Sequence, residues 1–272
     1  MRRARLAGDR EGMTHHPFRF GVVAGQAPDA ATWTGLARRA ESLGYATFLV
    51  PDTLGTPAPF TAAAVAATAT TTLRVGTYVL SAPNRTPAAV AWETATLRTL
   101  TGGRFELGLG AGRPDAEHDA AMLGVAFGTP GRRIERLSET IDAVKDVRIV
   151  VAASGTRLLR LAGQKADTVA LGVPPATTEE QVAAKVDELY ELAGDRFPAL
   201  ELNMNLACAG SEPPDWALAR FGRTGTGILT GTAAEMAGTL LRRRDRLGVS
   251  YVTVNAQFMD ALAPVVERLT GT

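Results

Sequence analysis

Short runs of apolar and β-branched residues alternate along the chain with stretches in which apolar residues recur at helical spacing. The short runs predict strands, which lie at residues 18–24, 47–51, 73–80, 105–110, 148–153, 168–171, 200–207 and 251–254. The stretches between them predict helices, at residues 30–43, 59–69, 87–100, 132–146, 156–164, 178–193, 233–247 and 259–269. Gly44 and Gly248 follow two of these helices, in the position where a residue with positive φ commonly ends a helix.

Strands that each precede a helix predict a parallel sheet with the helices outside it. The chain has 272 residues, and eight strand–helix units in about 250 residues favour closure into a (β/α)8 barrel, the TIM barrel. An open doubly wound sheet is the alternative, but residues 24–28 lack the Gly-x-Gly-x-x-Gly turn typical of it. No break in composition marks a second domain. Residues 18–272 are therefore expected to form one α/β barrel domain, with the active site at the C-terminal ends of its strands.

The first residues differ from the rest of the chain. Residues 1–17 carry four arginines but no apolar run of the kind found in a secretory signal. We expect a disordered tail, or an upstream start with Met13 as the alternative initiator. His15 and His16 lie in this tail without nearby partners for a metal ion.

One predicted connection is unusually long. Residues 208–232, between the seventh strand and the seventh helix, contain Trp216 and several glycines. Loops of this length are commonly functional lids or disordered segments. Gly222, Gly225 and Gly227 are candidate hinges of such a lid, and a plain surface excursion is the alternative.

Charge and cysteine content narrow the class of protein. The net charge of +1 provides no field that favours nucleic acid or an anionic membrane. The single cysteine, Cys208, excludes an intramolecular disulfide and fits a reducing compartment. No apolar run approaches the roughly 20 residues of a membrane span. No spacing of His, Cys or carboxylates predicts a metal site. The single cysteine and the lack of a membrane span favour a cytoplasmic location.

Three groups of segments resemble the luciferase-like oxidoreductase superfamily. They are residues 20–22 with 40–45 and 48–52, residues 73–77 with 96–97 and 102–112, and residues 229–232 with 246–252. Segment 102–112 is the most specific, and the last group is most similar to the actinobacterial branch that uses the deazaflavin coenzyme F420. The resemblance implies a luciferase-like TIM barrel that transfers hydride from F420 to a C=C, C=N or carbonyl centre of a small substrate. Such a role suits secondary metabolism.

Two alternatives to an F420-dependent reductase stay open. One is an FMN-dependent monooxygenase of the same superfamily, and the other is a cofactor-free enzyme or a non-catalytic barrel. The chain also departs from the superfamily, because the usual excursion between the fourth helix and the fifth strand is almost absent near residue 147. This shortened connection implies a more open pocket, or reliance on residues 208–232 and a partner subunit for cover.

Two strand ends carry the candidate catalytic residues. Asp52 ends the second strand, where the superfamily usually has an acid followed by histidine, but here Thr53 follows. Threonine is a poor proton donor near neutral pH, so Asp52 is left to orient water or substrate, or to cap a turn. The resemblance implies that Tyr78, Val79 and Ser81 contact the cofactor ring, with a cis peptide bond near Tyr78 and Val79. Tyr78 is a candidate proton donor or a packing residue.

Two further turns are expected to hold the cofactor. Glycines alternate along the end of the fourth strand, and the resemblance places Gly110, Ala111 and Gly112 against the ring; tight packing of the strand is the alternative. The turn between the fifth strand and the fifth helix is a candidate phosphate site, because amides at a helix N-terminus bind anions. Its residues are Ser154, Gly155, Thr156 and Arg157. Thr156 is also a candidate N-cap, and Arg157 adds a charge suited to phosphate.

Polar residues on other loops and strands are candidates for binding substrate. Asn84 and Arg85 follow the third strand, and Arg85 can bind a carboxylate. His118 is the best remaining acid or base, with a solvated loop histidine as the alternative. Asn203 and Asn205 alternate along the seventh strand and so point to the same side.

The small residues of the second predicted helix are relevant to dimerisation. Barrels of the superfamily usually dimerise through their second and third helices. The run of small residues at 61–70 allows close packing across such an interface, so a homodimer is expected.

Overall fold

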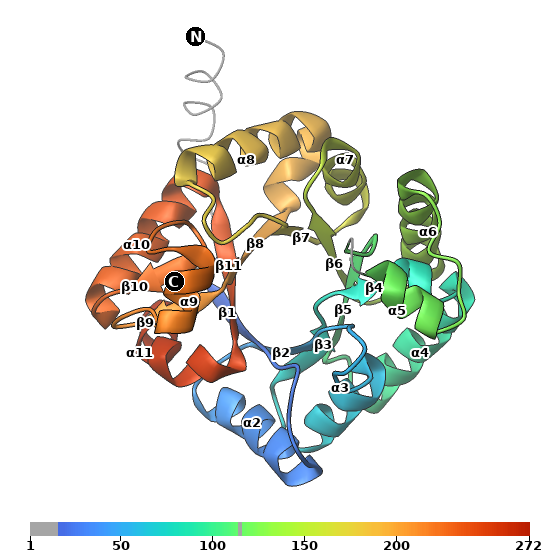
Figure 1. Ribbon diagram of the computed structural model, residues 1–272, viewed down its shortest axis with the longest axis horizontal. Coiled ribbons are helices and arrows are strands. Elements are labelled where there is room, and N and C mark those ends of the chain that lie inside the picture. Colours follow the sequence, from blue (N-terminus) through green and yellow to red (C-terminus); the bar gives the residue numbers. More distant parts are fainter. Residues whose placement is uncertain (1–15, 114–115) are drawn as a thin grey trace.

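A closed barrel of parallel strands, surrounded by helices, forms the body of the protein (Figure 1). The computed structural model describes residues 16–113 and 116–272. Around the barrel, each strand pairs in parallel with the next, and β3 and β5 close the ring. The strands are β1 (Arg19–Val23), β2 (Thr47–Val50), β3 (Arg74–Thr77), β5 (Phe105–Gly110), β6 (Arg148–Ala153), β7 (Thr168–Leu171), β8 (Glu201–Leu206) and β11 (Val249–Asn255). The predicted (β/α)8 barrel is confirmed.

An outer ring of helices covers the barrel (Figure 1). Its members are α2 (Ala30–Ser42), α3 (Pro59–Thr68), α4 (Pro87–Leu100), α6 (Pro130–Ala143), α7 (Thr156–Lys165), α8 (Glu179–Ala193), α10 (Ala233–Leu247) and α11 (Met259–Leu269). Helix α6 begins two residues before its predicted start, because Thr129 caps it through the amide of Arg132 and Pro130 takes the first helical position. The connection from α6 to β6 comprises only residues 144–147, which confirms the shortened connection.

The third strand differs from its prediction. Residues 73–80 form two pieces, β3 and β4 (Leu80–Ser81), and the break between them contains a cis peptide bond between Tyr78 and Val79. The cis peptide bond implied by the resemblance is thus confirmed. The break packs tightly on β5, since a Cβ added to Gly108 would lie 2.0 Å from the carbonyl oxygen of Thr77. Gly108 is therefore required by packing between neighbouring strands.

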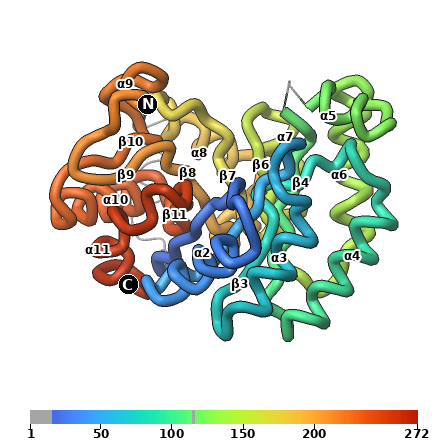
Figure 2. The backbone as a smooth tube through the Cα atoms, turned by 60° about the horizontal axis from the view of Figure 1, so that its bottom comes forward, coloured from blue at the N-terminus to red at the C-terminus, as the bar shows by residue number. Residues whose placement is uncertain are grey.

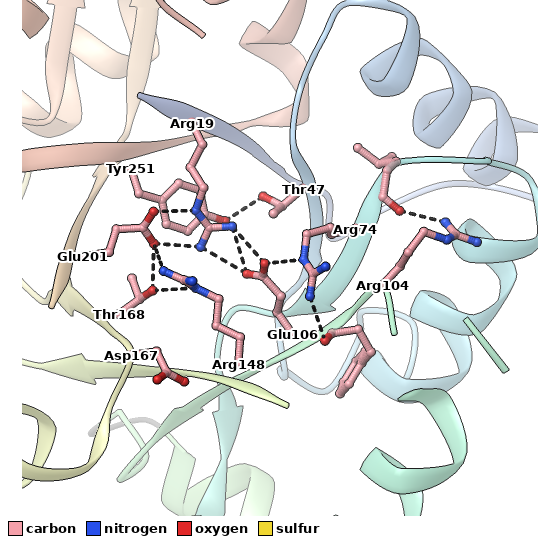
Figure 3. Close-up of polar contacts among 12 residues, drawn as sticks. Arg19, Thr47, Arg74, Arg104, Glu106, Arg148, Asp167, Thr168, Glu201 and Tyr251 are labelled. Carbon is pink, nitrogen blue, oxygen red and sulfur yellow. Dashed lines mark hydrogen bonds and ion pairs between the residues drawn. The ribbon is translucent and has the colours of Figure 1, made fainter. Parts of the chain in front are cut away.

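Charged residues at the N-terminal ends of the strands form a network at the bottom of the barrel (Figure 3). Glu201 accepts hydrogen bonds from Arg19 at 2.7 and 2.8 Å and from Arg148 at 3.1 Å. On the other side, Arg19 and Arg74 both bind Glu106. Both carboxylates are buried and fully surrounded by donors. The network therefore links strands from both sides of the barrel, at the end opposite to the expected active site.

Residues 208–232 are ordered and form small elements beside the barrel. They contain β9 (Cys208–Gly210), α9 (Asp215–Phe221) and β10 (Ile228–Thr230), and β9 pairs with β10. Two of the candidate hinge glycines are tightly packed: a Cβ on Gly225 or Gly227 would lie 2.3 or 2.7 Å from backbone atoms of Pro175. Through these close contacts, Gly225 and Gly227 pack residues 208–232 against the turn before α8. The predicted tail, residues 1–17, lies almost entirely outside the described residues.

Two short helices lie on opposite sides of the barrel (Figures 1 and 2). One is α9, and the other is α5 (Ala116–Met122), which lies between β5 and α6 and was not predicted. Short 3-10 turns cover Ala82–Asn84, Gly194–Ala199 and Ala256–Phe258. None of the helices among the described residues is both long and apolar enough to span a membrane.

Candidate active site

A cavity of about 290 Å³ opens at the C-terminal ends of β2 to β7. Nine of the residues predicted for the site line it: Asp52, Thr53, Tyr78, Val79, Ser81, Gly110, Ala111, Gly112 and Ser154. Other lining residues, among them Ala152, Ala153 and Gly172, are small. The cavity therefore has a largely apolar wall with few polar groups, as is usual for sites that bind small molecules. Among the described residues, those of 208–232 contribute nothing to this lining.

Asp52 is held by an ion pair with Arg85. The guanidinium of Arg85 donates to both carboxylate oxygens at 2.6 and 3.0 Å, and the amide of Ser81 donates to one of them at 2.8 Å. The charge that was expected to bind a substrate carboxylate is thus neutralised inside the protein. A bidentate pair of this geometry fixes both side chains, and the substrate contact of Arg85 stays a prediction.

Thr53 contacts an arginine that the sequence interpretation overlooked. Arg113 donates to the Thr53 hydroxyl at 3.1 Å and to the carboxylate of Asp119 at 3.0 Å. It therefore connects the loop after β2 to α5 at the rim of the cavity. His118, on the same helix, is exposed and is not a lining residue. Arg113 directly follows the glycine-rich segment at the end of β5. This position next to a strand end could have identified it as a candidate site residue from the sequence.

Polar side chains from opposite sides of the barrel meet in its interior. The hydroxyl of Tyr78 donates to Asn203 Oδ1 at 2.6 Å. The amide nitrogen of Asn203 donates to the carbonyl of Tyr251 at 3.2 Å and lies 3.4 Å from the hydroxyl of Thr253. Thr253 in turn donates to Asn205 at 3.0 Å. Asn203 and Asn205 thus point to the same side of β8, as predicted, and that side is the barrel interior.

Tyr78 keeps its proton throughout the physiological range. Burial raises the pKa of Tyr78 to about 12, although a hydrogen bond with Thr253 opposes the shift. A phenol with such a pKa stays neutral at pH 7, where it can donate or accept a hydrogen bond. It is the one predicted proton donor that both lines the cavity and is firmly held by another site residue.

Two buried polar atoms near the cavity have no partner within the described part of the chain. They are Ser81 Oγ and Asn84 Oδ1, and both residues are less than one-tenth exposed. Buried polar groups are nearly always hydrogen-bonded. Ser81 is a lining residue of the cavity, although its hydroxyl oxygen is itself buried. Asn84 is not a lining residue, so its predicted contact with substrate has no support from the geometry.

The N-terminus of α7 opens toward solvent beside the cavity. Ser154, Gly155, Thr156 and Arg157 are all exposed. Gly155 is the N-cap, and no side chain in the described residues caps this helix; the prediction of Thr156 as N-cap is therefore wrong. Its hydroxyl instead donates to Glu188 at 2.5 Å. Lys185 binds the carbonyl of Ser154 and brings to the turn a second cation, which sequence position alone did not reveal.

Gly110 and Gly112 owe their identity partly to packing within the protein. A Cβ on Gly110 would lie 2.9 Å from a methyl group of Val79, and one on Gly112 would lie 2.8 Å from the ring of Phe127. Gly112 also has a φ of 83°, which disfavours other residues. Tight packing, the alternative to ligand contact, therefore accounts for these glycines, although both still line the cavity.

Comparison with known proteins gives matches over the whole barrel. Residues 12–148, just over half of the chain, match the family described as luciferase-like monooxygenase. An F420-dependent glucose-6-phosphate dehydrogenase from Kribbella flavida is 29% identical over 223 residues, which cover 67% of this chain and 66% of that protein. The chain spans about half the length of other curated relatives, mycobacterial proteins matched over 47% of their length.

Solved structures share the fold at low sequence identity. The F420-dependent tetrahydromethanopterin reductase of Methanopyrus kandleri has a TM-score of 0.75 at 15% identity, covering 93% of this chain and 99% of that one. The oxygenating constituent of 3,6-diketocamphane monooxygenase from Pseudomonas putida, in complex with FMN, has a TM-score of 0.71 at 13% identity, covering 94% and 98%. At these identities the likeness shows a common fold, and it includes proteins of both cofactor types.

Proposed function

Because the chain belongs to the luciferase-like monooxygenase family, we propose that it is an oxidoreductase that uses coenzyme F420 to reduce a C=C, C=N or carbonyl bond of a small substrate. The observation that carries the proposal is the cavity at the strand ends with the uncapped N-terminus of α7 beside it. A relative that covers two thirds of the chain and is named for its dependence on F420 supports the choice of cofactor.

The residues around the cavity fit a flat ring with a phosphate-bearing tail. Gly110, Ala152 and Gly172 leave part of the wall without bulky side chains, and Ser81, whose buried hydroxyl has no partner among the described residues, is also in the lining. The free amides at the start of α7, with Arg157 and Lys185 nearby, suit a phosphate. When bound, F420 supplies a two-electron hydride donor. The protein must then bind it, orient it and provide a proton.

Within this chain, Tyr78 is the group that we propose as proton donor. Its hydroxyl is neutral, and the residue lines the cavity. In the structure the proton is donated to Asn203 Oδ1 at 2.6 Å, so the O–H must turn away from Asn203 to protonate a substrate. Thr53 is engaged by Arg113, and Asp52 is engaged by Arg85, so neither is free to take the place of the histidine usual in the family. The Asp52–Arg85 pair instead holds the segment from Ser81 in β4 to Arg85 in place.

Cofactor binding tests the proposed function directly. We expect oxidised F420 to bind the purified protein more tightly than FMN, measured by fluorescence titration of each cofactor. Tight binding of FMN without binding of F420 would favour an FMN-dependent monooxygenase. Failure of both to bind would favour a cofactor-free or non-catalytic barrel.

Variants in the α7 turn should weaken F420 binding without affecting folding. A Cβ at position 155 meets no atom within 4 Å, so Gly155→Val places its side chain in the space proposed for the phosphate. We expect it to weaken F420 affinity at least about tenfold, and Arg157→Ala about threefold, through loss of a charge-assisted contact. Arg160→Ala, a turn further along the same exposed face, is the matched control. Unchanged affinity in Gly155→Val would show that the phosphate binds elsewhere.

We further propose that two chains associate through α3 and α4. Trp92 and Leu100 on α4 are 75% and 74% exposed, and Val65 on α3 is 36% exposed. Between the two helices lies a groove of about 390 Å³ lined by alanines, threonines and leucines together with Arg104. Large apolar side chains at the surface are typical of interaction sites. The same face offers both protruding side chains and a groove, which suits a symmetric dimer.

Light scattering of the purified chain should therefore give twice the mass of the 28.6 kDa chain. Trp92→Glu places a charge in the proposed interface, and we expect it to yield monomers at micromolar concentration. Trp216→Glu, which changes an exposed tryptophan of α9, should leave the dimer intact. A monomeric wild-type protein would refute the proposal.

A further inference from the structure

Arg113 is the one cation among the described residues that line the active-site cavity. Its side chain is 40% exposed, whereas the side chain of Asp119, to which it donates at 3.0 Å, is 8% exposed and does not line the cavity. The carboxylate of this pair is therefore screened from the cavity. The guanidinium is the partner that a bound molecule meets.

The described residues use only part of the hydrogen-bonding capacity of Arg113. A guanidinium has five N–H groups, and Thr53 and Asp119 each accept from one terminal nitrogen of Arg113. Its Nε–H group has no partner in the described part of the chain. Arg85 differs, because both of its terminal nitrogens bind one carboxylate and it is not a lining residue. Of these two arginines, Arg113 is therefore the one that can donate to a molecule in the cavity.

Thr53 places a second donor beside Arg113. Its hydroxyl accepts from Arg113 at 3.1 Å, and both residues line the cavity. A hydroxyl that accepts from a guanidinium must direct its own proton elsewhere, and none of the described residues accepts that proton. The two side chains therefore offer N–H and O–H donors at one place in the lining, and such donors bind a carboxylate.

The other charge in the lining does not oppose an anion. Asp52 is the only carboxylate among the described lining residues. Its two oxygens accept from Arg85, and one of them also accepts from the amide of Ser81. The charge of Asp52 is thus compensated by a cation within the protein. An anion beside Arg113 therefore gains the attraction of a guanidinium without an uncompensated negative charge in the lining.

We infer that Arg113 and Thr53 bind the carboxylate of the substrate, which is then a small unsaturated carboxylic acid. The inference rests on the proposed function, because it names the class of substrate that the same cavity takes. Asp119 holds the guanidinium from the side away from the cavity. The planar fork of Arg113 matches the two oxygens of a carboxylate, which a lysine ammonium cannot do.

Binding of matched acids and amides tests this inference without turnover. The chain is loaded with oxidised F420, and NMR titration compares its affinities for crotonate and cinnamate with those for crotonamide and cinnamamide. Each amide has the shape of its acid but no charge. Arg113→Gln removes the cation, Arg113→Lys keeps the charge without the fork, and Thr53→Val removes the hydroxyl. Arg132→Gln, in an exposed pair with Glu135, is the matched control for loss of one positive charge.

We expect the wild-type protein to bind at least one acid about tenfold or more tightly than its amide, because the contact is charge-assisted. Arg113→Gln should abolish this preference, Arg113→Lys should leave it at about threefold, and Thr53→Val should weaken binding of the acid about threefold. Arg132→Gln should change nothing. Thermal unfolding checks that each variant is folded, and the comparison of acid with amide in the wild type needs no variant. Failure of both acids to bind more tightly than their amides, or a preference that survives in Arg113→Gln, would overturn the inference.

F420 binding, followed by the fluorescence of the cofactor, separates this inference from the proposed function. If Arg113→Gln weakens F420 binding about tenfold and the wild type shows no preference for the acids, Arg113 binds carboxylates of the cofactor tail and the inference fails. If F420 does not bind the wild-type chain, the proposed function fails. The acid and amide titrations are then repeated on the cofactor-free chain, and their result alone decides whether Arg113 and Thr53 form a carboxylate site.

Discussion

Replacing Glu201 with glutamine is expected to lower the free energy of unfolding by about 3–5 kcal/mol. Its carboxylate is 5% exposed and accepts from Arg19 through two bonds, from Arg148, and from the hydroxyl of Thr168 at 2.7 Å. The glutamine keeps the volume but removes the charge and presents an N–H group to these donors. It therefore leaves the largely buried Arg19 with one carboxylate, Glu106, in place of two, and it removes the carboxylate that pairs with the half-buried Arg148. Removal of one partner is the costly change for a buried ion pair.

The same substitution has a pH signature. Burial opposes ionisation of Glu201, but the hydrogen bond and charge of Arg19 and the charge of Arg148 outweigh it and lower the pKa below its ordinary 4.5. A carboxyl whose pKa is lower in the folded state stabilises the protein above the unfolded pKa, and this contribution disappears as the pH falls through the folded pKa. The stability difference between wild type and Glu201→Gln should therefore be largest near neutral pH and shrink below pH 4.5.

Chemical denaturation at several pH values measures both effects. Glu139→Gln, in the exposed pair of Arg136 and Glu139 with side chains 36% and 54% exposed, is the matched control. Exposed pairs contribute little, so we expect this variant to change stability by less than about 1 kcal/mol. A loss in Glu201→Gln no larger than that of the control would show that the network is not needed for the stability of the barrel.

The order of strands and helices could be predicted because each unit carries its own local signal. The apolar run that forms β6 and the periodic stretch that forms α8 each indicate their structure within a few residues. The break after β3 could not be found in this way, since Tyr78 and Val79 favour a strand, and the close contact of this segment with Gly108 joins distant parts of the chain. Helix α9, with seven residues, is too short to show a helical period.

The candidate site was less predictable than the fold because its interactions join distant parts of the chain. Strand ends indicated Asp52, Tyr78 and the turn before α7, since strand ends form the catalytic face of any such barrel. The sequence did not indicate the hydrogen-bond partners of these residues. Tyr78 and Asn203 are 125 residues apart in the sequence, and the pairing of Asp52 with Arg85 depends on the path of the loop after β4. The position of the site residues at the strand ends was therefore predictable from the sequence. The partners and directions of their hydrogen bonds could be determined only from the structure.

Replacing Tyr78 with phenylalanine is expected to lower kcat for substrate reduction by about 10²–10⁴-fold, the usual loss when a positioned proton donor is removed. The variant keeps the aromatic ring that lines the cavity and removes only the hydroxyl bound by Asn203. F420 affinity should therefore change little, which separates loss of the proton from loss of the cofactor site. Single-turnover reduction of an enone by reduced F420 measures the first quantity, and fluorescence titration measures the second.

The pH dependence of the wild-type enzyme provides the complementary test of Tyr78. With a pKa raised from 10.0 to about 12 by burial, the phenol stays protonated at pH values where an ordinary tyrosine ionises. A rate that depends on this proton should stay constant up to about pH 10 and fall only as the pH approaches 12, provided that the protein is still folded by circular dichroism. Tyr190→Phe, on the outer helix α8, is the matched control and should leave both rate and profile unchanged. If Tyr78→Phe retains the wild-type rate, the proton comes from another group or from water, and Tyr78 serves only to hold Asn203.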